Sequence, residues 1–287
     1  MEGEMFERSR AMLGEDAMRR IAALRVAVFG LGGVGSWCAE ALVRTGVRKL
    51  TLVDDDTVAA SNVNRQRQAM PSTIGQLKAE TLRDQLLAIV PDAEIHAIPE
   101  RYTPETVDRF DAVIDGADFV IDAIDSVDCK AHLIRRVVEW KGGKCCQCGN
   151  VANSNDQLPI GNSQLPTIFS SMGAALRMDP TKVRVSPFGK IAGDGLARAL
   201  RNRFRRDGFP IPNHLCVHSE EPPRETATGT KGSLMPVTCA FGMALAYLVI
   251  SRAGSVFMPH SSFVSSQRNS RSSSGTTSIA QSSAPLS

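Results

Sequence analysis

A glycine-rich turn directly after an apolar segment constrains the fold of this chain most strongly. Residues 26–29 read Val-Ala-Val-Phe, and residues 30–35 continue as Gly-Leu-Gly-Gly-Val-Gly. A short apolar run predicts a buried strand, and the glycines after it allow a tight turn that opens a helix. A second apolar segment, 50–53, ends in the acidic residues 54–56. This order predicts the nucleotide-binding βαβ unit of a doubly wound sheet.

Strand and helix signals alternate along most of the chain. The α/β alternation predicts a doubly wound, Rossmann-like, mostly parallel sheet with helices on both faces, and such sheets bind ligands at the carboxyl ends of their strands. We expect strands at 25–29, 49–53, 94–98, 119–125 and 166–170, and helices at 6–24, 33–44, 75–90, 103–110, 127–139 and 195–206.

The composition divides the chain into one large domain and a tail. Residues 1–253 are expected to form a single nucleotide-binding domain. Within it, residues 142–164 are rich in Gly, Asn, Gln, Ser and Cys and show no period, so we expect an irregular insertion there. Serine accounts for 12 of the last 27 residues, which predicts a disordered tail over 254–287.

One segment, 234–250, is almost wholly apolar. At 17 residues it is at the short limit for spanning a bilayer, so we expect a buried core helix and no stable membrane insertion. A membrane contact through this segment is the weaker alternative. Seven cysteines in a chain whose N-terminus is acidic and not apolar indicate a reducing, cytoplasmic location. The formal charge of +3 is too small to indicate nucleic-acid binding by itself.

The glycine turn and the acid after the second strand predict the contacts of a nucleotide. Glycines at 30, 32, 33 and 35 (Gly30, Gly32, Gly33 and Gly35) let the backbone approach a phosphate, and the helix behind them offers N–H groups to the anion. Asp54 is placed to accept hydrogen bonds from a ribose. These residues alone indicate only a nucleotide, because proteins that bind NAD, FAD or ATP share such a turn.

The run Ser-Asn-Val-Asn-Arg-Gln at 61–66 narrows the nucleotide to ATP. Its amides, at Asn62, Asn64 and Gln66, have no role in binding a nicotinamide cofactor, but they place donors beside phosphates. Cleaving ATP between the α- and β-phosphates requires donors or cations on the developing charge. A guanidinium presents a rigid fork to phosphate oxygens, so Arg65 is the strongest catalytic candidate.

Two later elements carry further candidates. Lys78, early in the helix expected at 75–90, would add a second positive charge, although a lysine there is more often exposed to solvent. Asp125, at the end of the strand expected at 119–125, is placed to hold Mg²⁺ bound to the nucleotide. Asp122 lies deeper on the same face, where it could serve the site or act as a cap or a buried hydrogen-bonding group.

Together these motifs resemble those of the adenylating superfamily of ubiquitin-activating and sulfur-carrier-activating enzymes, which are ThiF-like. The residues that carry the resemblance are Gly-Leu-Gly-Gly-Val-Gly-Ser at 30–36, Asp54-x-Asp56, Asn-x-Asn-Arg-Gln at 62–66, Gly75-x-x-Lys78 and Asp-Ala-Ile-Asp-Ser at 122–126. Segments 33–37, 120–126, 170–174 and 178–182 are similar to the tRNA threonylcarbamoyladenosine dehydratase branch. The insertion at 142–164 is foreign to that pattern.

The resemblance implies an ATP-dependent ring closure on tRNA, with ATP and Mg²⁺ as cofactors. The carboxylate of the threonylcarbamoyl group, on the adenosine beside the anticodon, would be adenylated. An internal atom of the same side chain would then attack and expel AMP. The resemblance also implies a homodimer in which Arg10 reaches the ATP site of the partner. The alternative for Arg10 is an exposed arginine at the start of a helix.

The expected helix 195–206 is strongly basic and offers a surface for tRNA phosphates. Arg198, Arg201 and Arg205 are the candidate contacts, although the arginines surround much of the helix, so some must be solvated. Sulfur-carrier activators usually carry two Cys-x-x-Cys pairs for structural zinc. This chain lacks two such pairs, which favours the tRNA branch.

Three other functions remain open on the sequence alone. The nearest in chemistry is an activator that adenylates the C-terminus of a ubiquitin-like or sulfur-carrier protein. A nicotinamide-dependent dehydrogenase would use the same βαβ unit. A tRNA-binding or scaffold protein could keep the fold without catalysis, but intact Arg65, Lys78 and Asp125 argue against that function.

Overall fold

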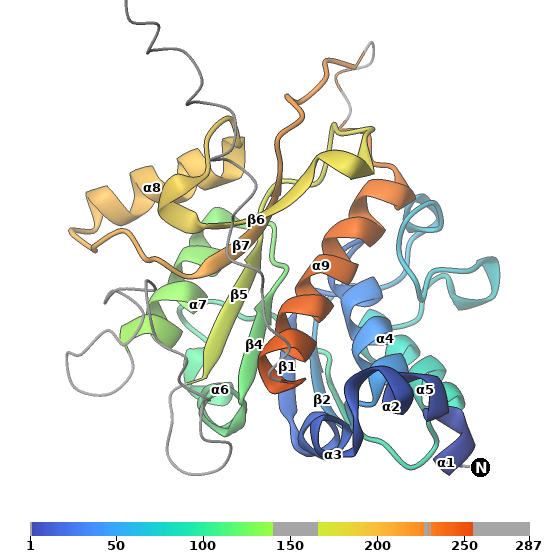
Figure 1. Ribbon diagram of the computed structural model, residues 1–287. Helices are drawn as coiled ribbons and strands as arrows, with labels where there is room; N and C mark the ends of the chain where they lie inside the picture. Colours follow the sequence, from blue (N-terminus) through green and yellow to red (C-terminus); the bar gives the residue numbers. More distant parts are fainter. Residues whose placement is uncertain (1, 140–165, 227–228, 230, 255–287) are drawn as a thin grey trace, which may run out of the picture. The chain divides into compact units, whose positions relative to one another are not determined.

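The computed structural model describes residues 2–139, 166–226, 229 and 231–254. Within these residues, seven strands form one sheet in the order β3-β2-β1-β4-β5-β7-β6 (Figure 1). Neighbouring strands are parallel except for β6 and β7, which are antiparallel. The predicted doubly wound, mostly parallel sheet is therefore confirmed. The strands are β1 (Arg25–Phe29), β2 (Lys49–Val53), β3 (Glu94–Ile98), β4 (Phe119–Asp122), β5 (Thr167–Ser171), β6 (Val183–Pro187) and β7 (Leu215–Ser219).

Helices cover both faces of the sheet (Figure 1). On one side α4 packs along α9, and on the other α7 packs along α8. The described helices are α1 (Glu2–Met5), α2 (Glu7–Leu13), α3 (Glu15–Ala23), α4 (Gly35–Thr45), α5 (Lys78–Ile89), α6 (Asp111–Gly116), α7 (Val127–Glu139), α8 (Gly195–Arg206) and α9 (Met235–Gly254).

Each layer has its own buried apolar packing. Between the sheet and α6–α8, the rings of Phe29, Tyr102 and Phe110 meet edge to face, with centroids 5.3–6.0 Å apart. On the other face, Gly242 allows α9 to approach α4 closely. A Cβ at Gly242 would lie 2.7 Å from the carbonyl oxygen of Val34. Both contacts fix elements that begin or end near the carboxyl edge of the sheet.

The apolar segment near the C-terminus forms α9. By length and composition this helix could cross a membrane, but half of the relevant window is buried inside the protein. It packs against α3, α4 and strands β5, β6 and β7. The expectation of a core helix is confirmed.

Several element boundaries differ from the sequence predictions. The helix predicted at 6–24 is interrupted at Gly14, whose φ of +82° is outside the helical range and separates α2 from α3. Only a 3₁₀ turn, Val107–Arg109, forms within the helix predicted at 103–110, and α6 follows it. The strand predicted at 119–125 ends at Asp122, because the chain turns there toward α7.

Two parts of the predicted organisation lie outside the described residues. These are the insertion at 142–164 and the serine-rich tail at 254–287, apart from Gly254, the last residue of α9.

Candidate active site

The glycine turn connects β1 to α4 at the carboxyl edge of the sheet. Gly30 has φ +89°, and a Cβ there would lie 2.7 Å from the carbonyl oxygen of Ala123. A Cβ at Gly35 would lie 1.9 Å from the carbonyl oxygen of Gly30, so no side chain fits. Around Gly32, in contrast, nothing lies within 4 Å of such a Cβ. The turn therefore presents open backbone at Gly32 ahead of α4, where an anion could bind.

Asp54 follows β2 and is hydrogen-bonded to the glycine turn. Its carboxylate accepts a bond from the N–H of Leu31 at 2.6 Å and another from the N–H of Asp56 at 3.0 Å. Burial raises the pKa of Asp54, while the Leu31 N–H and the charge of Lys78 act in the opposite direction. Asp54 thus helps to set the shape of the turn, and its contact with a ribose stays a prediction.

The run 61–66 begins within the 3₁₀ helix Ala60–Asn62. Asn62 is buried, and its side-chain oxygen accepts a bond from the N–H of Ala59 at 3.0 Å. Asn64 donates to the carbonyl oxygen of Ser233, just before α9, at 3.0 Å. Gln66 is buried, and its Oε1 has no hydrogen-bond partner among the described residues. Asn62 and Asn64 therefore order the loop itself.

Arg65 lies against the glycine turn. A Cβ placed on Gly33 would be 3.2 Å from the Cγ atom of Arg65, and the indole N–H of Trp37 donates to the carbonyl oxygen of Arg65 at 2.9 Å. Its guanidinium Nη1 donates to the carbonyl oxygen of Ser61 at 2.9 Å and to Asn64 Oδ1 at 3.0 Å. The half-buried side chain of Arg65 thus contacts the turn through its Cγ atom, and its guanidinium carries further N–H groups of the kind that bind phosphate oxygens.

Lys78 is buried, in contrast to the solvent-exposed position that its place early in a helix suggested. Its side chain is 6% exposed, and Nζ lies 2.6 Å from Asp56 Oδ2. The side chain of Asp56 is 66% exposed. The ammonium therefore lies beside the acidic residues that follow β2, close to Asp54.

Asp125 and Asp122 belong to the exit of β4. Asp125 is exposed, three residues beyond the end of the strand. Asp122 is fully buried and forms an ion pair of 2.8 Å with Lys130 of α7. Burial raises the pKa of Asp122, and the ammonium of Lys130 opposes this effect. Of the roles left open for Asp122, the structure shows a buried hydrogen-bonding group.

Contacts join the glycine turn to three other predicted segments at one edge of the sheet. Asp54 binds the turn at Leu31, Arg65 packs on Gly33, and the exit of β4 meets Gly30 at Ala123. These segments supply backbone N–H groups, a guanidinium and carboxylates, which together suit a magnesium-bound nucleotide.

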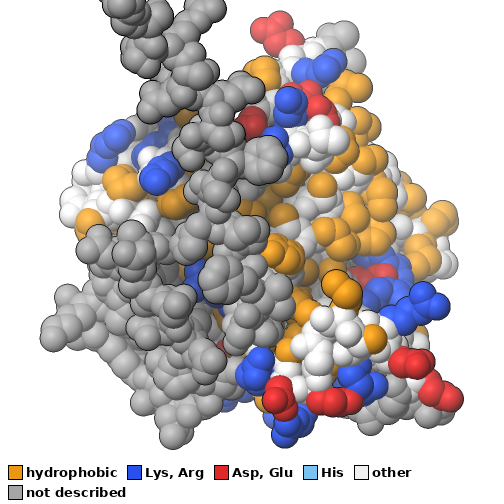
Figure 2. Space-filling view, viewed as in Figure 1, with side chains coloured by type: hydrophobic (Ala, Val, Ile, Leu, Met, Phe, Trp, Pro, Cys, Tyr) orange, Lys and Arg blue, Asp and Glu red, His pale blue; other side chains and the backbone are white. Residues whose placement is uncertain are grey.

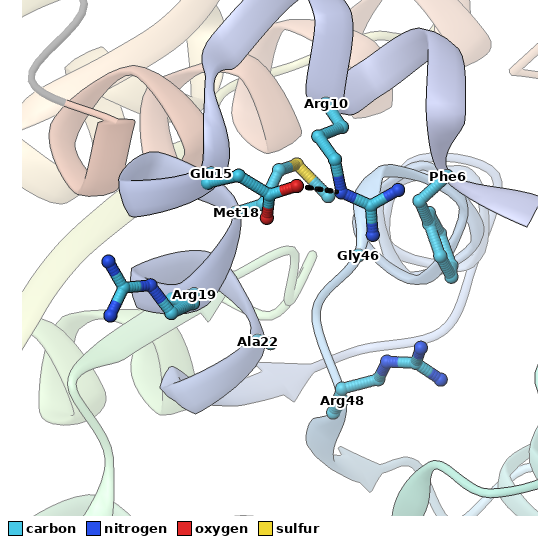
Figure 3. A pocket seen from close by; sticks show the side chains of 8 residues that line it. All are labelled: Phe6, Arg10, Glu15, Met18, Arg19, Ala22, Gly46 and Arg48. Carbon is cyan, nitrogen blue, oxygen red and sulfur yellow. Dashed lines mark ion pairs between the residues drawn. The ribbon is translucent and has the colours of Figure 1, made fainter. Parts of the chain in front are cut away.

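Arg10 lies elsewhere. On α2 it forms an ion pair of 2.7 Å with Glu15 and lines a hollow with Phe6, Gly46 and Arg48 (Figure 3). Gly46 and Arg48 precede β2, whereas Asp54 follows it. The five residues of β2 span about 17 Å at ~3.3 Å per residue, so Arg10 is at the opposite edge from the glycine turn of its own chain.

The basic helix is α8, as predicted, and its arginines differ in their surroundings. Arg198 and Arg205 are exposed. Arg201 donates to the carbonyl oxygen of Ile191 at 2.9 Å, and its guanidinium lies 5.8 Å from the ring centroid of Phe188. Arg201 therefore holds α8 against the preceding loop.

Two buried ion pairs, Lys130 with Asp122 and Arg177 with Asp194, were not predicted. Lys130 lies on the face of α7 that also carries Ile134 and Val137. A lysine on an apolar helix face was the sequence feature that could have indicated a buried ion pair. Arg177 and Asp194 are both buried, with the closest nitrogen and oxygen 3.6 Å apart. Asp194 also caps α8 through a bond of 2.8 Å from the N–H of Ala197, but no sequence spacing pairs it with Arg177.

Comparisons with known proteins show the family of this chain. The model of the ThiF family matches residues 6–252. The chain is similar to the tRNA threonylcarbamoyladenosine dehydratase of Bacillus subtilis (strain 168), with 34% identity over 76% of this chain and 75% of that protein. The enzyme of the same name from Escherichia coli (strain K12) is 31% identical over 90% of this chain and 91% of that protein.

A solved structure is similar over nearly the whole chain. It is the crystal structure of the E. coli tRNA N6-threonylcarbamoyladenosine dehydratase in complex with ATP. The TM-score is 0.74 at 30% sequence identity, and the match covers 88% of this chain and 95% of that one.

Proposed function

This chain belongs to the ThiF family, and on that premise we propose that it is an ATP-dependent tRNA threonylcarbamoyladenosine dehydratase. The substrate is the modified adenosine beside the anticodon of tRNA, and the products are the cyclised base, AMP and pyrophosphate. Residues 1–253 form the adenylating domain. Two dehydratases that span most of this chain support the proposal.

The observation that carries the proposal is the position of Arg65. Its main chain is bonded to Trp37 and its Cγ atom packs on Gly33, so the side chain lies beside the glycine turn, and in this proposal the guanidinium reaches from Ser61 and Asn64 to the phosphates. A dehydrogenase can also place an arginine near its cofactor phosphates, but its reaction takes place at the nicotinamide. An enzyme that cleaves a triphosphate needs the guanidinium at the phosphates themselves, because charge develops on their oxygens.

The reaction proceeds in two steps. A carboxylate oxygen of the threonylcarbamoyl group attacks the α-phosphorus of ATP, the bond to the β-phosphate oxygen breaks, and pyrophosphate leaves. An internal atom of the same side chain then attacks the activated carbonyl carbon, the bond to AMP breaks, and a ring closes with release of a proton. The carboxylate oxygen lost from the base leaves with AMP, so the net change is a dehydration.

Each site residue has a role in the first step. The open backbone at Gly32 and the N-terminus of α4 bind phosphate oxygens. Arg65 stabilises the negative charge that develops on the α- and β-phosphates. Lys78 supplies a second positive charge, for which its ammonium must be shared with or released from Asp56. Asp54, Asn62 and Asn64 keep the turn and the loop in place.

We assign Mg²⁺ to Asp125. Its exposed carboxylate follows β4 at the edge that carries the glycine turn, and carboxylate oxygens are ligands that Mg²⁺ prefers. When bound, the ion would neutralise charge on the phosphate oxygens of the nucleotide. One carboxylate is enough in this proposal, because Mg²⁺ usually keeps several water ligands and binds proteins through one or two carboxylates.

The functional unit in this proposal is a homodimer. Arg10 is at the opposite edge of the sheet from the glycine turn of its own chain, so in this proposal it acts in the site of a second copy. Figure 2 shows hydrophobic side chains gathered over α9 and the elements beside it. Met243 and Tyr247 of α9 are 40% and 47% exposed. Such an apolar face supports burial against a second copy.

The tRNA contact in this proposal lies on α8. Arg198 and Arg205 are exposed and seven residues apart, which places them on one side of the helix. Arg201 is engaged within the protein and contributes less. We propose a cytoplasmic location, which the packing of α9 as a partly buried core helix supports.

Pyrophosphate exchange tests the proposal against its nearest alternative. The protein is mixed with ATP, labelled pyrophosphate and either tRNA that carries threonylcarbamoyladenosine or candidate carrier proteins. The proposal expects label to enter ATP only with the modified tRNA, and unmodified tRNA is the matched control. Exchange that requires a carrier protein and ignores the modified tRNA would replace the dehydratase by an activator of that carrier.

A further inference from the structure

The ion pair between Asp122 and Lys130 lies beneath the site. Both side chains are fully buried, and Nζ is 2.8 Å from Oδ2. Removing two charges from water is costly, and apolar residues of similar volume often replace such a pair without loss of stability. Stability alone therefore does not explain a lysine at this position.

Lys130 also binds the turn that follows β4. Its ammonium donates to the carbonyl oxygen of Ile124 at 3.0 Å and lies 3.3 Å from the carbonyl oxygen of Asp122. The ammonium thus donates to two carbonyl oxygens, while Oδ2 of the carboxylate meets it as an ion pair without an aligned hydrogen bond. The carboxylate of Asp122 in turn accepts a bond from the N–H of Ile124 at 3.2 Å. The turn is thus fixed through both its carbonyl and its amide groups.

The fixed turn connects the glycine turn to the magnesium ligand. Ala123, between the two bonded carbonyls, donates its N–H to Phe29 at 2.8 Å and packs against Gly30 and Gly35. Asp125 directly follows Ile124, whose carbonyl Lys130 binds. A change at Lys130 would therefore move Asp125 relative to the phosphate-binding backbone.

The same pair also belongs to a buried polar row. Asp122 of β4 is in register with Ser170 of β5, and Ser170 with Cys216 of β7. His214 Nε2 lies 3.0 Å from the hydroxyl of Ser170. A purely structural role within this row is the alternative that an experiment must separate.

We propose that Lys130 is a positioning residue, which holds the turn 122–125 so that Asp125 presents its carboxylate to Mg²⁺ on the bound nucleotide. The inference rests on the proposed function. It adds a residue of α7 that touches neither ATP nor the ion.

The test measures binding of ATP to the full chain by calorimetry, with and without Mg²⁺. The ratio of the two dissociation constants is the metal-dependent gain in affinity. The double variant Asp122→Leu, Lys130→Met removes both buried charges at once. Arg136→Met is the matched control, because Arg136 lies on the same helix and binds Asp111 of α6 at 2.6 Å.

We expect the double variant to melt near the parent temperature and to lose about 10-fold to 100-fold of the metal-dependent gain, as is typical when a residue that orients a metal ligand is removed. Affinity for ATP without the metal should change little, and the control should keep the full gain. A folded double variant with the full gain would overturn the inference.

Two further measurements apply if the double variant does not fold. Lys130→Arg keeps the charge but replaces the compact ammonium, so it should fold and lose part of the gain. In the protein without substitutions, amide hydrogen exchange of the peptide that covers 122–126 should be as slow as that of β4. Rapid exchange there without nucleotide would overturn the inference. An unmodified protein that lacks any metal-dependent gain would instead overturn the role of Asp125 in the proposed function.

Discussion

The indole N–H of Trp37 donates a hydrogen bond to the main-chain carbonyl oxygen of Arg65 at 2.9 Å. Trp37 belongs to the first turn of α4, directly behind the glycine turn, whereas Arg65 lies in the loop between β2 and α5. The bond joins the two segments that the proposed chemistry must bring together. It fixes the main chain of Arg65 and leaves the guanidinium to its contacts with Ser61 and Asn64.

Replacing Trp37 by Phe should therefore reduce activity more than stability. The ring remains as packing, but one hydrogen bond of about 1 kcal/mol is lost, which allows the Arg65 loop to shift. We expect AMP release to fall about 5-fold to 10-fold, with a change in Tm of a few degrees. Steady-state AMP release and a melting curve measure the two effects, and an unchanged rate would contradict the role of this bond.

The glycine turn gives a pair of matched substitutions. Gly35→Ala places a Cβ 1.9 Å from the carbonyl oxygen of Gly30, so the turn must distort and the protein should lose about 1–3 kcal/mol of stability. Gly32→Ala meets nothing within 4 Å and should fold normally. Because its methyl group enters the space for phosphate, it should still weaken ATP binding. Urea unfolding and ATP titration check both variants, and normal ATP affinity of Gly32→Ala would contradict phosphate binding there.

A mixture of two inactive variants tests whether Arg10 acts in the partner's site. Arg10→Ala and Arg65→Ala should each be inactive as homodimers. After subunit exchange, half of the dimers combine both variants, and each of these has one site with both arginines, so about a quarter of all sites should recover. AMP release before and after mixing measures this. No recovery in a mixture that is shown to exchange subunits would remove Arg10 from catalysis.

The arginines of α8 should separate into two groups in tRNA binding. Arg198→Ala and Arg205→Ala each remove an exposed charge, so affinity should fall and the slope of log K against log salt should shrink by about 1 for each phosphate that the variant no longer neutralises. Arg201→Ala removes the bond to Ile191 and should lower the Tm with little change in slope. Filter binding at several salt concentrations measures these slopes. If all three variants keep the slope of the parent protein, the tRNA binds at another surface.

His214 predicts a loss of stability in acid. Burial lowers its pKa from 6.5 to about 3, so below pH 6.5 the unfolded chain binds a proton that the folded protein does not. The stability contributed by the neutral ring is complete above pH 6.5 and is lost as the pH falls toward 3. Between pH 7.5 and 5 the loss is about 2 kcal/mol. Urea unfolding at both values should show a smaller loss for His214→Asn, whereas the exposed His96→Asn should match the parent.

The first half of the fold follows from local patterns in the sequence. Strands β1, β2 and β3 and helix α7 have the bounds that apolar runs and helical spacing predict. The antiparallel pair β6 and β7 was missed. No residue of Val183–Pro187 is fully buried, and polar residues separate its two valines, so pairing with β7, and not local burial, makes it a strand.

The parts of the candidate site that consist of neighbouring residues in the sequence could be predicted. The glycine turn and the run 61–66 lie together as the sequence implied, because both follow parallel strands at one edge. Pairings between distant residues were not predictable. The contact of Lys78 with Asp56 and that of Lys130 with Asp122 depend on the packing of helices on the sheet, which no short motif records.

Mass spectrometry of tRNA nucleosides tests the central claim most directly. tRNA that carries threonylcarbamoyladenosine is incubated with the protein in the presence and absence of ATP, digested under mild conditions and analysed. The proposed function predicts that, only with ATP, the modified nucleoside is replaced by a product that has lost one water, and that Arg65→Ala prevents this change. Modified nucleoside that stays intact with active, ATP-binding protein would contradict it.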